Sequence, residues 1–238
     1  WNFRVSDPAI SLDPVAGDSL VNAIENASPI ELTGKISATD QLVLGQFAVG
    51  DITINLLPKT GGVAVSATVI SYDPATGIWK GEVPAQSLVN GNTYEVNVAV
   101  DKTGVGSAST MSYVDVDTVA PTVVISSDKS ALKAGETATL TLTFSEVVSG
   151  LTVSDLDAQG GVLSNLVQSQ SNGKVWTATY TPNAGVNNVS ETISVTGHPS
   201  DAAGNQLSST GGTLSTAITV DTVAPTVVIS SDKSALKA

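Results

Sequence analysis

Hydrophobic and polar residues alternate with a period of two along much of the chain. The pattern is clearest where Ala138, Leu140, Leu142 and Phe144 are separated by single threonines. Because alternate side chains of a strand point to opposite faces, this pattern predicts a strand with one buried face. The same alternation predicts further strands at Ile30–Ile36, Ile52–Leu56, Val63–Ile70, Ile78–Val83, Tyr94–Val100, Val175–Tyr180, Ile193–Val195 and Leu214–Val220.

Turn-forming residues separate these strands. Examples are Thr-Gly-Gly at 60–62, Asn-Gly-Asn at 90–92 and Pro-Asn-Ala-Gly at 182–185, and such runs favour tight turns. Short strands with turns at this spacing indicate an antiparallel β-sandwich, and helical periodicity is limited to one or two turns within Leu20–Asn26. We therefore expect an all-β chain of two tandem Ig-like antiparallel β-sandwiches joined by short linkers.

A nineteen-residue string occurs twice, at 116–134 and at 220–238. The copies lie 104 residues apart, which is about the size of one small domain, and a fixed period indicates an array of similar units. Residues 1–6 fit either the end strand of a preceding unit or the start of domain one. The remaining boundaries that we expect are Ig-like domain one at 7–116, Ig-like domain two at 117–220, and the truncated start of a third repeat at 221–238.

The composition excludes several classes of function. Acidic residues number 22 against 10 basic ones, for a formal net charge of −12, which argues against a nucleic-acid partner because phosphates require Lys and Arg. No apolar run approaches the roughly 18 residues of a transmembrane helix, so no membrane insertion is expected. We expect a monomer whose partners are the neighbouring repeats of its own chain.

The chain offers little for catalysis. It has no cysteine and a single histidine, His198, so disulfides and thiolate metal sites are impossible. No nucleophile, acid and base gather in a pattern that predicts an active site. We therefore do not expect an enzyme.

Acidic residues fall in segments that an Ig-like sandwich brings to one end. In this fold the B–C and F–G loops lie at the end where the chain enters the domain. For domain two, these segments hold Asp115 and Asp117 before the first strand, Glu146 after the second, and Asp201 in the F–G loop. Crowded carboxylates repel each other unless a cation joins them, and calcium takes 6–8 oxygen ligands. The sequence therefore predicts a Ca2+ site at the start of domain two.

Less complete copies of this arrangement are expected elsewhere. Domain one offers Asp7 before its first strand, Asp40 in its B–C region and Asp101 in the place of Asp201, while Asp221 repeats Asp117 at the next linker. Each acid taken alone is also explained without a metal, as a turn starter or a solvated strand end. The A–B loops supply further candidates at the opposite end of each domain, namely Asp18, Glu25, Asp128 and Glu136.

Several motifs of domain two occur together in a known group of proteins. They are Asp-Thr-Val-Ala-Pro at 117–121, Leu-Lys-Ala-Gly-Glu at 132–136, Phe-Ser-Glu at 144–146, Tyr-Thr-Pro-Asn at 180–183 and Asp-Ala-Ala-Gly-Asn at 201–205. With these motifs the domain resembles the bacterial Ig-like extender repeats of giant RTX adhesins, which include biofilm-type and ice-binding adhesins of Gram-negative bacteria.

Domain one resembles a sister subfamily of the same repeats. The residues that carry this likeness are Asn-Ala-Ile-Glu at 22–25, Leu-Thr-Gly at 32–34 and Gly-Ile-Trp-Lys at 77–80. Domain one departs from the repeat at 101–105, where Asp-Lys-Thr-Gly-Val replaces Asp-Ala-Ala-Gly-Asn. A cation is added and an asparagine is lost, which makes a metal site at Asp101 less well supported.

The resemblance implies a structural extender or spacer segment of a large secreted bacterial adhesin. It further implies calcium ions that rigidify the interdomain linkers, export by a type I secretion system, and attachment to the outer surface of a Gram-negative cell. Three alternatives stay open. They are a carbohydrate- or protein-binding Ig-like module with an aromatic patch near Tyr72 or Trp79, an accessory domain of a secreted hydrolase, and the cell-proximal anchoring region of the adhesin.

Overall fold

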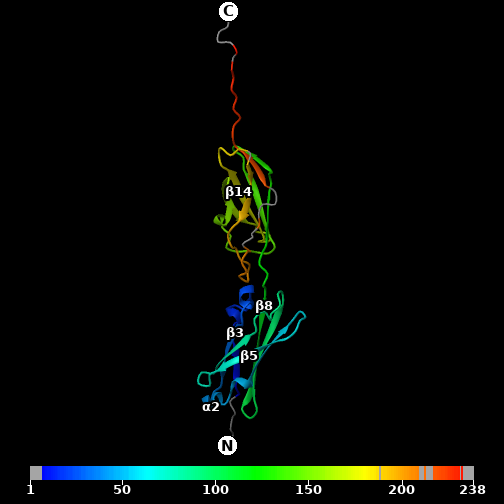
Figure 1. Cartoon of the computed structure of the whole chain (residues 1–238). Helices are drawn as coiled ribbons and strands as arrows, with labels where there is room; N and C mark the ends of the chain where they lie inside the picture. The colour runs from blue at the N-terminus through cyan, green and yellow to red at the C-terminus, as the bar shows by residue number, and fades with distance from the viewer. Residues whose placement is uncertain (1–6, 188, 209–211, 213–216, 231, 233–238) are drawn as a thin grey trace, which may run out of the picture. The chain divides into compact units, whose positions relative to one another are not determined.

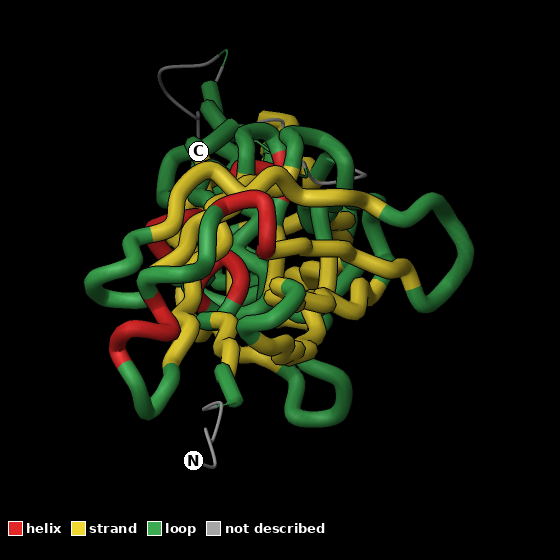
Figure 2. The backbone as a smooth tube through the Cα atoms, turned by 90° about the horizontal axis from the view of Figure 1, so that it is seen from below, coloured by secondary structure: helices red, strands yellow, loops and turns green. Residues whose placement is uncertain are grey.

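Strands make up most of the secondary structure in the computed structural model, which describes residues 7–187, 189–208, 212, 217–230 and 232. The contacts divide the chain into two units, one of residues 1–120 with 200–206 and one of residues 121–199 with 207–238 (Figure 1). Helices are few and short (Figure 2). In the described ranges, no helix is long and apolar enough to cross a membrane. The expected fold class, all-β with two β-rich units, is confirmed.

The first unit is built from eight strands that form one continuous hydrogen-bonded series in the order β1-β3-β6-β5-β4-β7-β8-β2. Two four-residue α-helices, α1 (Ala23–Asn26) and α2 (Gln41–Leu44), and two 3-10 turns, η1 (Val15–Gly17) and η2 (Val49–Asp51), connect them. The strands are β1 (Ala9–Leu12), β2 (Leu20–Val21), β3 (Ile30–Ser37), β4 (Ile52–Pro58), β5 (Val65–Tyr72), β6 (Ile78–Val83), β7 (Thr93–Lys102) and β8 (Gly106–Val116).

The alternating residues of the first unit form its core. In β7, the side chains of Tyr94, Val96, Val98 and Val100 are all buried, and the residues between them are partly exposed. Trp79 on β6 is fully buried. It pairs in register with Gly34 on β3, where a glycine leaves room for the indole ring.

The second unit is a sandwich of short sheets around one core. A four-stranded sheet has the order β13-β14-β11-β9, and two smaller sheets have the orders β10-β17-β15 and β12-β16. Buried residues from all three sheets contact one another, among them Leu140, Tyr180 and Ile218. The elements are β9 (Val123–Ser127), β10 (Ala131–Lys133), β11 (Ala138–Phe144), η3 (Val153–Asp155), β12 (Leu156–Ala158), β13 (Gly161–Gln168), β14 (Val175–Pro182), β15 (Val189–Glu191), β16 (Ile193–Val195) and β17 (Ile218–Asp221).

The two units share one pattern of strand pairing. In each, a first strand pairs antiparallel with the next long strand, and a short following strand pairs parallel with the last strand. The first unit does this with β1 on β3 and β2 on β8, and the second with β9 on β11 and β10 on β17. The register agrees as well, because Val21 lies opposite Val116 and Leu132 lies opposite Val220. The two units therefore pair their first two strands in the same way.

Some expected elements differ in the structure. The helix expected over Leu20–Asn26 begins only at Ala23, because Leu20 and Val21 form β2 against β8. The strand expected from Val63 starts at Val65, and the strand expected over Leu214–Val220 is observed from Ile218. Residues 214–216 lie outside the described residues, as do residues 1–6 and their expected strand.

Candidate metal centre

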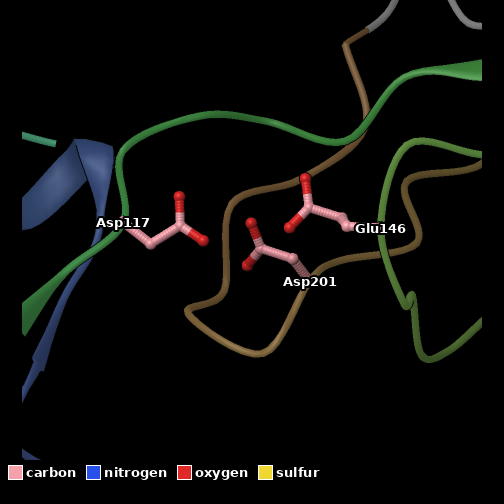
Figure 3. Close-up of side chains that lie close together, drawn as sticks. All are labelled: Asp117, Glu146 and Asp201. Atoms are coloured by element: carbon pink, nitrogen blue, oxygen red, sulfur yellow. The ribbon is translucent and has the colours of Figure 1, made fainter. Parts of the chain in front are cut away.

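Three of the predicted metal-binding acids lie close together. The side chains of Asp117, Glu146 and Asp201 each offer a carboxylate oxygen, and these oxygens all lie within 4.8 Å of one another. Figure 3 shows the three carboxylates pointing toward a common point from three separate segments of the chain. We call these residues the acidic cluster. Asp201 is buried, and Asp117 and Glu146 are half-buried.

The loop of residues 200–206 holds Asp201 in a fixed place. Its ends pair as an isolated bridge between Ser200 and Gln206. Within it, the Asn205 backbone N–H donates to Asp201 Oδ1 at 2.9 Å, and Asn205 Nδ2 donates to Asp201 Oδ2 at 2.9 Å. Gly204 turns the chain with a φ of 89°, a conformation that glycine adopts without strain. The Asp-Ala-Ala-Gly-Asn motif is thus a self-bonded loop that orients one carboxylate.

Asn205 also ties this loop to the segment that carries Asp117. Its Nδ2 donates to the Asp117 backbone carbonyl at 2.8 Å, and its Oδ1 accepts the Ala23 N–H at 2.9 Å. Ala23 is presented by a capping box, in which Asn22 Oδ1 accepts the Glu25 N–H and Glu25 Oε2 accepts the Asn22 N–H. The predicted ligand set does not include Asn205. The signal available in the sequence was its position four residues after Asp201, next to a glycine.

Glu146 is positioned by the end of β11. The next residue after that strand, Ser145, donates its N–H to the Thr122 carbonyl at 2.9 Å and accepts the Thr122 N–H on its Oγ at 3.0 Å. Lys174 Nζ donates to the Ser145 carbonyl at 2.9 Å. The B–C loop therefore lies against the segment leading into β9, as the Ig-like topology predicts for Glu146.

The electrostatics of the acidic cluster favour a hard cation. Two unit charges 4.8 Å apart repel by about 3 kcal/mol at an effective dielectric constant of about 20. Every charged group in the cluster is an oxygen donor, which suits Ca2+ or Mg2+ and not metals that prefer sulfur or imidazole. His198 lies elsewhere, with its Nδ1 at 3.3 Å from the Leu207 carbonyl oxygen. The residues present therefore fit calcium.

The other predicted ligands are not part of this group. Asp115 lies on β8 and its carboxylate accepts a hydrogen bond from Thr93 Oγ1. Asp221 Oδ1 accepts the Val223 N–H at 3.0 Å, just as Asp117 Oδ1 accepts the Val119 N–H at 3.1 Å. Several further candidates bond to nearby backbone N–H groups, namely Asp18, Glu25, Asp40, Asp128 and Glu136.

Domain one has a different arrangement at its own candidate site. Asp7 is exposed and precedes Pro8, which lies against Gly106, the first residue of β8. Asp101 is exposed near the end of β7, opposite Ser107. Lys102, the cation next to Asp101, does not pair with that acid. Its Nζ instead forms a salt bridge with Asp51 Oδ2 at 3.0 Å. Among the residues that the structure describes, neither Asp7 nor Asp101 belongs to a group of three acids that could hold a metal ion.

The aromatic patch that a sugar-binding module would need is not present near Tyr72 and Trp79. Trp79 is 0% exposed and belongs to the core. Tyr72 is half-buried, and its hydroxyl donates to the Leu44 carbonyl at 3.0 Å. The Trp79 ring therefore offers no face to a ligand, and no exposed patch forms from Tyr72 and Trp79 together.

Comparisons with known proteins agree with the fold. Residues 117–220 match the family described as bacterial Ig-like domain. No curated protein matches the chain in sequence.

Among solved structures, the chain is similar to one concerned with host cell surface retention of a 1.5-MDa bacterial ice-binding adhesin. The TM-score is 0.48 at 23% identity, covering 93% of this chain and 67% of that one. A second similar structure is that of a Ca2+-stabilized adhesin that helps an Antarctic bacterium bind ice. Its TM-score is 0.44 at 17% identity, and the match covers 92% of this chain and 50% of that one. A third is a tetra-tandem repeat in the extending region of a large adhesion protein. Its TM-score is 0.31 at 18% identity, and the match covers 91% of this chain and 49% of that one. The chain thus spans about half the length of two of these structures.

Proposed function

We propose that this chain is a spacer segment of a large bacterial adhesin, and that calcium bound by the acidic cluster stiffens it. Two observations support a spacer. Residues 117–220 match a bacterial Ig-like domain, and the first unit pairs its first two strands in the same way as the second unit. The nineteen-residue repeat at 116–134 and 220–238 supports a tandem array. The role is mechanical, not catalytic.

The convergence of Asp117, Glu146 and Asp201 is the observation that carries the calcium proposal. Without a cation, their mutual repulsion favours arrangements that separate the three segments. A bound Ca2+ replaces that repulsion with attraction to each carboxylate and so ties the segments together. The bond from Asn205 to the Asp117 carbonyl keeps two of these segments close before any ion binds. Calcium binding therefore has to order these two segments less than it would if they were free to move apart.

Calcium binding also makes the stability of the spacer depend on the calcium concentration around it. An ion that binds the folded chain and not the unfolded chain stabilises the fold by mass action. Extracellular calcium modules bind with dissociation constants of about 10⁻⁴–10⁻³ M. A site in this range stays empty in a low-calcium cytosol and fills outside the cell. We place the protein on the exterior of a Gram-negative cell, exported by a type I system and held at the surface.

The test is calcium-dependent stiffening. The full chain is freed of metal with a chelator and titrated with calcium, while thermal unfolding and small-angle X-ray scattering are recorded. Calcium is expected to raise the melting temperature and to narrow the distribution of interatomic distances. Asp117→Asn removes one charge and keeps the Oδ1 that accepts the Val119 N–H. This variant should melt higher than the parent in chelator and gain less from calcium.

Asp221→Asn is the matched control. Asp221 starts the same sequence run and makes the same bond, to Val223, but lies outside the acidic cluster. This variant should keep the full response to calcium. If calcium leaves both melting and scattering of the parent unchanged, the stiffening mechanism is wrong, although the spacer role would stand.

A further inference from the structure

Two asparagine-glycine pairs occur in the chain, at 90–91 and at 172–173. This dipeptide is chemically reactive, because glycine has no side chain to shield its backbone nitrogen from the carbonyl of the preceding asparagine side chain. Attack of that nitrogen on the side-chain carbonyl releases ammonia and converts the asparagine to an acid. Both asparagines are exposed, so their hydrogen bonds, and not their accessibility, distinguish the two pairs.

The pair at Asn90 is held in place by a segment distant in sequence. Asn90 Oδ1 accepts the Thr118 N–H at 2.6 Å, across 28 residues. The Gly91 nitrogen, which would be the nucleophile, donates its N–H to the Val116 carbonyl at 2.8 Å. Ring closure at Asn90 therefore requires the loss of two hydrogen bonds to the segment that leads out of β8.

The pair at Asn172 lies in the turn between β13 and β14, and its hydrogen bonds stay within that turn. Asn172 Oδ1 accepts the Lys174 N–H at 3.1 Å, which folds the side chain back along its own backbone as an Asx turn. This turn brings Cγ near the Gly173 nitrogen, and the Lys174 N–H stabilises negative charge that develops on Oδ1 during attack. The Gly173 N–H has one bond to lose, to the Ser169 carbonyl at 3.2 Å.

We propose that Asn172 is a site of spontaneous deamidation in the folded protein, whereas Asn90 is protected. The Gly173 nitrogen forms a bond to Asn172 Cγ and gives up its proton, the Cγ–Nδ2 bond breaks, and Nδ2 leaves with that proton as ammonia. Solvent water then opens the cyclic imide at one of its two carbonyls. One opening gives aspartate, and the other gives isoaspartate, in which the backbone passes through the side chain. This inference does not depend on the spacer function.

The turn that carries Asn172 is bonded to the end of β11. The Lys174 carbonyl accepts the Phe144 N–H at 2.9 Å, and Lys174 Nζ donates to the Ser145 carbonyl at 2.9 Å. Isoaspartate lengthens the backbone of the turn by one carbon atom, and so displaces Lys174 from these partners. Deamidation therefore loosens the end of β11, directly before Glu146 of the acidic cluster.

The test follows both asparagines in one sample of the full chain, kept in warm, mildly alkaline buffer and analysed by peptide mass spectrometry. Asn172 is expected to deamidate at least about fivefold faster than Asn90, the factor that corresponds to one additional hydrogen bond. In denaturant, where these bonds are lost, the two rates should become similar. Equal rates in the folded chain, a faster rate at Asn90, or a difference that persists in denaturant would overturn the proposal.

Two variants separate the effect of isoaspartate from those of ageing and charge. Asn172→Gln has a longer side chain that closes the ring poorly, and Asn172→Asp has the charge of the product with a normal backbone. Hydrogen exchange of the Phe144 amide should rise several-fold in the aged parent, and stay low in aged Asn172→Gln and in fresh Asn172→Asp. Unchanged exchange in a parent that carries isoaspartate at this position would overturn the link to β11.

Discussion

The Asn205 side chain is joined to the Asp117 backbone by a hydrogen bond of 2.8 Å from Nδ2 to the carbonyl oxygen, across 88 residues of sequence. The same amide holds the Asp201 carboxylate and accepts the Ala23 N–H. The side chain of one buried asparagine therefore satisfies three groups in three segments, and it does so beside two of the three acids of the proposed calcium site. Its role is to position those acids.

Replacing Asn205 with alanine should destabilise the fold. The change leaves the Ala23 N–H, the Asp117 carbonyl and one Asp201 oxygen without their partners, at a combined cost of roughly 2–3 kcal/mol. Urea unfolding measures the loss, and hydrogen exchange of the Ala23 amide localises it. Asn172→Ala serves as the control, because Asn172 is exposed and bonds only locally to the Lys174 N–H. Equal unfolding free energies for the two variants would contradict the positioning role.

Gly34 should not tolerate a side chain. An added Cβ would lie 2.0 Å from the Ser11 carbonyl oxygen and 2.5 Å from the Trp79 ring. Because neither the backbone nor the buried indole can yield easily, Gly34→Ala should cost about 3 kcal/mol or more. Gly50→Ala is the matched control, since nothing lies within 4 Å of its added Cβ. Thermal unfolding compares them, and similar melting temperatures would refute the close packing of β3 on Trp79.

The pair of Lys102 and Asp51 should make the first unit sensitive to acid. The hydrogen bond from Lys102 is the largest cause that lowers the pKa of Asp51 below 3.8. A carboxyl with a lowered folded pKa stabilises the fold above its unfolded value, and this contribution is lost as the pH falls from about 3.8 through the folded value. Lys102→Met should raise the pKa of Asp51 and reduce stability at neutral pH only.

The measurement is an NMR titration of the Asp51 side chain together with acid unfolding curves. The parent and Lys102→Met should differ near neutral pH and converge at low pH. Lys35→Met, which removes an exposed cation from β3 of the same unit, should leave the Asp51 titration unchanged. A Lys102→Met curve parallel to the parent at every pH would show that the ion pair is not responsible.

We expect the Tyr180 phenol to ionise only at high pH, so that the second unit loses stability in alkaline solution. Its folded pKa is raised from 10.0 to about 12, first by burial and then by the charge of Glu191. Below pH 10 the phenol is protonated in both states, and stability is then lost as the pH rises from about 10 to about 12, because only the unfolded chain releases the proton there. In chelator, Glu191→Gln should lower the pKa of Tyr180.

Ultraviolet absorbance of tyrosinate follows this titration, with Tyr180→Phe identifying the signal. An unchanged Tyr180 titration in Glu191→Gln would show that the two groups do not interact.

Much of the fold could be predicted from the alternation of residues. It predicts β3, β4, β6, β7, β11 and β14 because each has one buried face and one exposed face. Strand β13 was not among the expected strands. It contains a register shift between Ser164 and Val167, and Asn165 has a φ of 52°. A bulge interrupts the period of two, so the pattern that identifies a regular strand is lost.

The convergence of Asp117, Glu146 and Asp201 followed from the order of loops in an Ig-like sandwich. The sequence alone could not show that Asp115 accepts a hydrogen bond from Thr93 or that Lys102 forms a salt bridge with Asp51. The partner of each of these side chains depends on which residues the strands bring next to it. Whether the cluster binds calcium stays a prediction.

The repeated string separates what local sequence determines from what tertiary structure decides. Asp117 and Asp221 make the same local bond to the N–H two residues ahead, because an aspartate in this context needs no distant partner. By contrast, Val-Val-Ile-Ser-Ser forms β9 at 123–127, with Ile125 fully buried, whereas the same letters from Val227 form no strand in the described part, and Ile229 is 89% exposed. At the first copy, β11 supplies hydrogen-bond partners and an apolar face. Sequence determines the capacity to form that strand, and a neighbouring strand decides whether it forms, because a strand without a partner cannot satisfy its backbone or bury its side chains.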